Sequence, residues 1–355
     1  MAHKSHLPKL PSLRGGIIRI EAGDCVKAVS ALLLFALITA CGGGSGGGSS
    51  GLSYSGAITP ASLTATNSAT LLSDAYAEGN SAANVDRIGS VASLTNSTHA
   101  APRRPRGLAL SEALITFIRL SAAGDTLNAP SVAAAVTTIP TNTLSGGCGG
   151  SATVNGSYDD VSSAISVTAT FNSYCQNGTT LNGDISASGN AVISSSSILS
   201  ISNLSITVSN LTVDMGGGDF FTAGGALSII PQSGYSSIAT HSVITINMLF
   251  KDNLTTKVYK LENYAISQTM TLGYNDMLIT GRYYDPDAGY IDLSTPTTIR
   301  AAMTDLWPSS GALKGTGNGS SATLIALDNT TYQLDVDTDN NGTPESTTTG
   351  LWIDL

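Results

Sequence analysis

The sequence predicts a mainly β protein, an antiparallel meander that forms a curled or partly closed barrel or a sandwich, preceded by two short N-terminal helices. Three observations favour this class. Apolar and hydroxyl residues alternate in many short runs after residue 147, as they do in half-buried strands. Turn-forming sequences separate these runs, and no helical pattern intervenes between them. Successive strands are therefore expected to pair with one another.

The N-terminal part of the sequence is typical of an export signal. Ala28–Ala40 is an apolar run that is too short to span a bilayer, which takes about 20 residues, but it suits the centre of a secretory signal peptide. Residues 1–25 contain two prolines and two acidic residues, which is unusual before such a run. We interpret residues 1–25 as a mis-annotated extension, with translation starting at Val26, and residues 26–40 as the signal peptide.

The residues Ile38-Thr39-Ala40-Cys41 resemble the lipobox of bacterial lipoproteins, in which a peptidase cuts before a lipidated cysteine. The resemblance implies that Cys41 is triacylated and anchors the chain. Residues 41–55 form a Gly/Ser tether. The residue after Cys41 is Gly42. An aspartate at this position would resemble an inner-membrane retention signal, so Gly42 favours the outer membrane. As a whole the chain resembles uncharacterised bacterial lipoproteins, a likeness that implies no particular activity.

Residues 56–146 are predicted to form a helical and linker segment. The first helix is expected over Thr66–Gly79, with Thr66 or Asn67 as its N-cap and Gly79 at its end. The second is expected over Leu108–Leu120, where apolar residues recur at helical spacing.

Residues 147–355 are predicted to form one β domain. Two near-copies in this region reverse their alternation at Ser202-Asn203 and Ser209-Asn210, which indicates bulges or a tight turn. A transmembrane barrel shares the alternation, but aromatic residues make up only 6% of the chain, few for two girdles. The expected strands are Ala164–Phe171, Ser242–Phe250, Thr256–Tyr264, Met277–Tyr284, Gly289–Leu293, Ala322–Leu327, Tyr332–Val336 and Gly350–Ile353. The expected turns are Asn182-Gly183, Gly216–Gly218, Asp285–Gly289 and Asn318-Gly319.

The charge of the chain disfavours nucleic acid as a partner. Five of the 16 basic and two of the 25 acidic residues precede Cys41, so the mature chain carries a net charge near −12. Lys and Arg are absent between Leu120 and Phe250 and again after Lys314. No basic stripe is therefore present to neutralise phosphates, and membrane attachment depends on acyl chains.

Cys148 and Cys175 are the two cysteines that remain after the leader and the lipidated residue are set aside. A bridge between them closes a loop of 28 residues, from 148 to 175 inclusive, for which chain entropy predicts about 3 to 4 kcal/mol. Such a bridge belongs in an oxidising compartment. The alternatives are two free thiols or half of a metal site, although no histidine lies nearby in the sequence.

The stretch Asp337–Glu345 is the most specific chemical pattern. Oxygen-bearing side chains occupy loop positions 1, 3, 5 and 9, and glycine occupies position 6, which suits a calcium ion that takes about six to eight oxygen ligands. The loop resembles those of thrombospondin type 3 repeats, although a single copy is present. The resemblance implies the ligands Asp337, Asp339, Asn341 and Glu345 through side chains and Thr343 through its carbonyl. The alternative is an empty, solvated acidic hairpin turn.

The sequence predicts no catalytic site. It contains no Gly-x-Ser-x-Gly elbow and no His-Glu-x-x-His motif, and His241 is the single histidine of the β region. We therefore expect a non-enzymatic binding or structural module of the cell envelope, with a protein or a glycan as its partner. The alternative is a carrier of an apolar ligand in a half-open barrel. A glycan-active enzyme would need paired carboxylates, for which Asp285 with Asp287 or Asp305 with Asp328 are the candidates.

Overall fold

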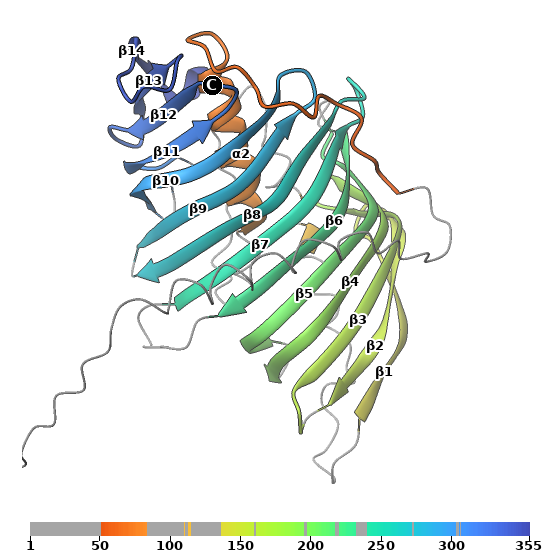
Figure 1. Cartoon of the computed structure of the whole chain (residues 1–355). Helices are drawn as coiled ribbons and strands as arrows, with labels where there is room; N and C mark the ends of the chain where they lie inside the picture. Colours follow the sequence, from red (N-terminus) through yellow and green to blue (C-terminus); the bar gives the residue numbers. More distant parts are fainter. Residues whose placement is uncertain are drawn as a thin grey trace, which may run out of the picture. The chain divides into compact units, whose positions relative to one another are not determined.

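Fourteen antiparallel strands form one sheet in the computed structural model (Figure 1). The spatial order of the strands is their order in the chain, which confirms the predicted meander. In chain order the strands are β1 (Val136–Ser145), β2 (Gly149–Asp159), β3 (Ala164–Gln176), β4 (Thr179–Ser194), β5 (Ser197–Asp214), β6 (Phe220–Pro231), β7 (Thr240–Asp252), β8 (Val258–Thr271), β9 (Tyr274–Asp285), β10 (Gly289–Ala302), β11 (Ser310–Thr316), β12 (Ser321–Ala326), β13 (Thr331–Asp337) and β14 (Ser346–Leu351).

The structure describes residues 51–83, 110, 113–114, 136–159, 161–194, 197–216, 220–231, 240–271, 273–302, 305 and 307–355. The predictions for residues 1–50, which include the signal peptide and lipidation of Cys41, lie outside these ranges. So does most of the predicted helix over Leu108–Leu120. Of that segment, Leu110, Ala113 and Leu114 are described, and their side chains are buried in the hydrophobic core.

The sheet of the described strands does not close into a barrel, and it does not form the alternative two-sheet sandwich. Among the described strands, β1 and β14 do not pair, and all fourteen belong to one sheet that is not closed into a barrel. A helix takes the place of a second layer over part of this sheet. Helix α2 (Ser68–Ala83) packs against β7, β8 and β11–β13, so these strands bury their apolar side chains without a facing sheet.

One α-helix element, not two, is present in the described part of the chain, and it differs from its prediction at the C-terminal end. Gly79 was expected to end the helix, but α2 continues to Ala83. A Cβ atom at Gly79 would lie 2.0 Å from the ring of Tyr264. Gly79 is therefore needed for close packing against β8 and not for termination. The described helical residues include no segment long and apolar enough to cross a membrane.

Tyr264 is the centre of the contact between α2 and the sheet. Its side chain is fully buried, and its hydroxyl donates a hydrogen bond to the Ala75 carbonyl oxygen at 3.0 Å. Tyr76 stacks on Trp307 from the connection between β10 and β11, with ring centroids 6.0 Å apart. These contacts join the apolar face of α2 to the inner face of the sheet, on which the buried strand residues lie.

Two local expectations are corrected by the strand register. Asn182-Gly183 was predicted to be a turn, but it lies inside β4 at a bulge opposite Asn210. Gly183 has φ +120°, and a Cβ there would lie 2.6 Å from the Asn210 carbonyl oxygen, so the glycine serves the bulge. Gly350–Ile353 was predicted to be a strand, whereas β14 ends at Leu351 and a 3₁₀ helix covers Trp352–Asp354.

The predicted irregularities at Ser202-Asn203 and Ser209-Asn210 are confirmed as bulges. The pairing of β4 with β5 shifts register next to Asn203. The pairing of β5 with β6 shifts between Val208 and Leu211, where Asn210 adopts φ 49°. The two near-copies therefore belong to one long, bulged strand and not to a repeat.

Candidate functional site

The acidic loop Asp337–Glu345 connects β13 to β14. Asp337 is the last residue of β13 and pairs with Ser321 of β12, which leaves its side chain only 6% exposed. Asp339 and Glu345 are exposed. Carboxylate oxygens from these three residues all lie within 4.8 Å of one another, so the fold brings together three of the predicted calcium ligands.

Two residues of the loop adopt left-handed backbone angles. Asn340 has φ 55° and Gly342 has φ 91°, a left-handed region that suits glycine and asparagine. A Cβ at Gly342 would meet no atom within 4 Å. Glycine is therefore required there for its backbone angle, as the loop pattern predicts, and not for space.

Backbone amides already hydrogen-bond to the acidic side chains. The amides of Asn341 and Gly342 donate to the Asp337 carboxylate at 3.1 and 2.8 Å. The amide and hydroxyl of Thr338 donate to Glu345 at 2.5 and 3.0 Å. Each carboxylate has about four lone-pair sites, so these bonds leave oxygen positions for a cation.

Hydrogen bonds lower the pKa values of two carboxyl groups in the loop, Asp337 and Glu345. Burial raises the pKa of Asp337, but hydrogen bonds from the Gly342 and Asn341 amides outweigh it, so the net shift is downward. The pKa of Glu345 is lowered chiefly by the Thr338 amide. Both groups are ionised at neutral pH, and the sequence offers no cation after Lys314 to offset them.

The other two predicted ligands, Asn341 and Thr343, are not part of the cluster of three carboxylates. The Asn341 side-chain oxygen accepts a hydrogen bond from the Thr343 amide at 2.8 Å, which stabilises the loop itself. Asn341 and Thr343 are both exposed. The chemistry of the three carboxylates fits a hard divalent cation such as calcium, and Asn341 and Thr343 lie on the same turn.

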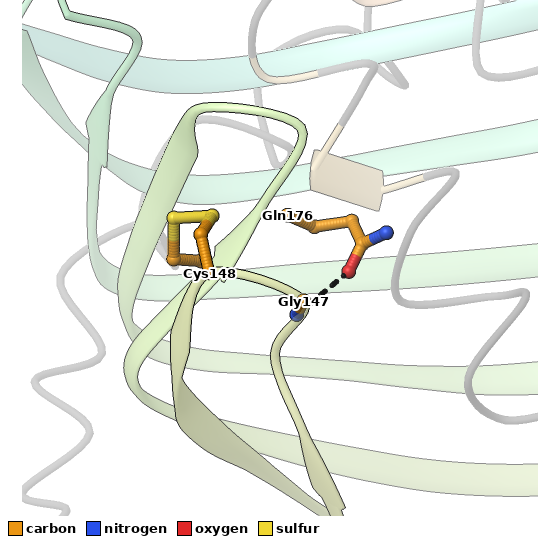
Figure 2. The surroundings of a disulfide bond; sticks show 4 residues. Gly147, Cys148 and Gln176 are labelled. Atoms are coloured by element: carbon orange, nitrogen blue, oxygen red, sulfur yellow. Dashed lines mark hydrogen bonds between the residues drawn. A yellow bond between two sulfur atoms is a disulfide. The ribbon is translucent and has the colours of Figure 1, made fainter.

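The predicted disulfide between Cys148 and Cys175 is present, with Cα atoms 5.1 Å apart (Figure 2). Cys148 lies in the turn between β1 and β2, and Cys175 lies near the end of β3. The Cys148 amide donates to the Cys175 carbonyl oxygen at 3.1 Å, and the Gly147 amide donates to the Gln176 side-chain oxygen at 3.1 Å. The bridge therefore fastens the first turn of the sheet to its third strand.

The acidic residues considered for glycan chemistry take part in local structure. Asp285 accepts the amides of Asp287 and Ala288 at 2.9 and 2.8 Å, and Asp287 pairs with Lys257. Asp328 accepts two amides and a hydroxyl from Thr330 and Thr331, while Asp305 accepts from the side-chain amide of Asn329 at 3.0 Å. These bonds order turns or join neighbouring connections of the sheet.

His241 is exposed on β7, and its Nδ1 lies 2.7 Å from the Thr269 hydroxyl of β8. This contact is a cross-strand hydrogen bond between surface side chains.

The fold and these features define an antiparallel single-sheet protein with a disulfide-tied first hairpin and an acidic last hairpin. Comparison with protein-family models, with curated proteins and with solved structures finds no match to the chain. The functional argument therefore depends on the residues themselves.

Proposed function

We propose that this chain is an outer-membrane lipoprotein, anchored through Cys41, whose sheet acts as a non-enzymatic binding or structural module of the cell envelope. The observation that carries the proposal is the Cys148–Cys175 bridge. Structural disulfides persist in oxidising compartments outside the cytoplasm, and the lipobox-like Ile38–Cys41 predicts export to such a compartment. Two independent parts of the chain thus support the same destination.

Mass spectrometry of the protein purified from its own envelope tests the anchor. We expect a chain that starts at Cys41 and carries three acyl groups, with Cys148 and Cys175 oxidised. Cys41→Ser should abolish acylation and leave the unprocessed precursor. The matched control, Cys148→Ser with Cys175→Ser, should stay acylated. A mature chain without acyl mass, or processing that Cys41→Ser leaves unchanged, contradicts the proposal.

The acidic loop supports a structural role for calcium at Asp337, Asp339 and Glu345. For a dissociation constant of about 1 mM, typical of extracellular modules, about 10 mM calcium would stabilise the fold by about 1.4 kcal/mol. Thermal unfolding with and without calcium measures this shift. Asp339→Asn should remove it, whereas Asp287→Asn, an exposed acidic residue in another hairpin turn, should retain it. Equal calcium shifts in both variants would mean non-specific screening.

One observation favours the carrier as a second candidate. Asn275 lies on the inner face of β9 and is 2% exposed. Its amide nitrogen donates to Gln268 at 3.0 Å, but its Oδ1 has no hydrogen-bond partner. A buried, unpaired acceptor costs stability, so a polar group of a ligand that displaced its present neighbours would gain a hydrogen bond there.

Native mass spectrometry of the protein from the same envelope preparation distinguishes the carrier from the binding or structural module. A carrier retains a lipid in native mass spectra, and Asn275→Leu reduces its occupancy. Met277→Leu, a conservative change at a neighbouring buried position of the same strand, is the matched control and should leave occupancy unchanged. A protein that is acylated at Cys41 but retains no further lipid favours the module.

A further inference from the structure

Alternate connections of a meander lie at the same end of its sheet. One end of this sheet therefore holds the turns that follow β1, β3, β5, β7, β9, β11 and β13. We call it the tether end. The far end holds the turns that follow the even-numbered strands, and it also holds the end of β14.

The N-terminal segment before α2 is bound along the tether end, where Figure 1 shows it in orange beside the strand ends. Leu52 lies beside Gly224, near the start of β6. The Ala57 amide donates to the Pro286 carbonyl oxygen at 2.9 Å, and the Asn318 amide donates to the Ala61 carbonyl oxygen at 2.7 Å. The described chain thus begins at the tether end.

The sequence between Cys41 and this bound segment is short. Gly42–Gly51 has ten residues, and a Gly/Ser chain of that length has a root-mean-square span of about 16 to 19 Å, and about 35 Å when fully extended. Strand β5 has 18 residues, which extend about 60 Å. An anchor at Cys41 therefore keeps the tether end near the lipid and holds the far end away from it.

Three large apolar side chains are exposed at the tether end, in the N-terminal segment, at the start of β6 and in the β7–β8 turn. Ile58 is 74% exposed, Leu254 is 68% exposed and Phe220 is 39% exposed. The Asn253 amide donates to the Phe220 carbonyl oxygen at 3.0 Å, which places Leu254 next to Phe220. An ion pair between Lys257 and Asp287 joins that turn to the β9–β10 hairpin, against which Ile58 lies.

We propose that the tether end rests on the membrane surface with Leu254, Ile58 and Phe220 in the lipid interface, an inference that depends on the proposed anchor at Cys41. The short tether selects this end, since exposed large apolar side chains such as Val161, Leu327 and Ile353 also lie at the far end. Burial of apolar area then stabilises the contact with lipid. Charge does not attract this end to anionic lipid, because Lys251 and Lys257 are outnumbered by Asp252, Asp285 and Asp287, and the acidic loop after β13 lies at the same end. The lipid it fits is therefore zwitterionic, and the far end is presented to a partner.

Fluorescence quenching on vesicles tests the orientation. The mature chain offers no free thiol once Cys41 is acylated and Cys148 is bridged to Cys175, so Leu254→Cys and Val161→Cys each accept one environment-sensitive fluorophore. Val161, in the β2–β3 turn of the far end, is 72% exposed and serves as the matched position. In phosphatidylethanolamine vesicles with nitroxide-labelled head groups, we expect several-fold stronger quenching at residue 254.

A second pair of variants tests the apolar contact itself. Ile58→Ser with Phe220→Ser should reduce quenching at residue 254, because the tether end then loses the other two exposed apolar side chains of the proposed contact. Leu327→Ser with Ile353→Ser, both exposed at the far end, should leave it unchanged. Replacing part of the lipid with phosphatidylglycerol should also reduce the quenching.

The outcomes distinguish the two proposals. Equal quenching at residues 254 and 161, or stronger quenching at 161, on protein that floats with the vesicles overturns the orientation and leaves the anchor standing. Protein that carries no acyl group and does not float overturns the anchor and the orientation together.

Discussion

The two halves of the sheet, β1–β7 and β8–β14, share one topology but are stabilised by different interactions. Lys and Arg are absent from the N-terminal half until Lys251. Its outer face carries cross-strand rows of small hydroxyl side chains, such as Thr168, Ser186 and Thr207 on β3, β4 and β5. The disulfide between Cys148 and Cys175 fastens its first three strands.

The C-terminal half instead uses ion pairs and aromatic stacking. Arg282 of β9 forms a bidentate ion pair with Asp292 of β10, with hydrogen bonds of 2.7 and 3.1 Å. Its guanidinium lies 3.9 Å from the centre of the Tyr290 ring. Trp307 and Trp352 stack with centroids 5.0 Å apart. A meander therefore needs no single stabilising chemistry, because backbone pairing and inner-face burial are common to both halves.

The largest effect is expected where α2 meets the C-terminal half. Tyr264→Ala removes the side chain that contacts Gly79 and bonds to the Ala75 carbonyl, and we expect a loss of about 4 kcal/mol in the free energy of unfolding. Tyr264→Phe keeps the ring and should cost only about 1 kcal/mol. Urea denaturation measures both. Equal losses would mean that the hydrogen bond, and not packing, holds α2 on the sheet.

A smaller effect is expected for the bridge of the N-terminal half. Cys148→Ser with Cys175→Ser should lower the free energy of unfolding by about 3 kcal/mol, from the loop it no longer closes. Hydrogen exchange should quicken in β1–β3 and stay unchanged in β8–β14, because each half has its own stabilising contacts. Faster exchange in all fourteen strands would show that the halves unfold as one unit.

The sequence predicts the C-terminal half better than the N-terminal half for a physical reason. In β10 and β13, large residues such as Ile291, Leu293 and Leu334 alternate with polar ones, so the two-residue period of a strand is easy to recognise. Strands β2 and β4 bury small residues such as Ala152 and Ala187 and contain glycines within the strand, so their pattern is weak. Strand β1 also lies outside the predicted strands, since it begins at Val136, before the boundary predicted at residue 147.

The candidate site was predictable because a turn is a local structure. The spacing of Asp337, Asp339 and Glu345 is enough to bring their carboxylates together once two left-handed residues reverse the chain. The single open sheet was not predictable, because closure depends on whether β1 and β14 meet across the whole chain. The contacts between residues 57–63 and the hairpin ends were not predicted either. They join residues far apart in the sequence, and no local pattern marks them.

The smallest effect is expected for the ion pair between Arg300 and Asp276, which joins β10 to β9 at 2.7 Å. The hydrogen bond from Arg300 lowers the pKa of Asp276, against a smaller opposing effect of burial. Because the folded pKa is below the unfolded one, the contribution is complete above about pH 4 and is lost as pH falls through the folded pKa. At neutral pH, Asp276→Asn should cost only about 0.5 kcal/mol, because the pair is partly exposed.

Salt and pH separate this pair from the carboxylates of the other half. About 1 M salt should erase most of the effect of Asp276→Asn, and the variant and the parent should converge in stability once the pH falls below the lowered pKa of folded Asp276. The matched control is Asp184→Asn in β4, where Asp184 accepts a hydrogen bond from Thr170 at 2.7 Å. Because its strand neighbours carry no cation, its effect should persist in salt. A salt-sensitive Asp184→Asn would show that long-range charge also acts in the N-terminal half, and the contrast between the halves would then be one of degree.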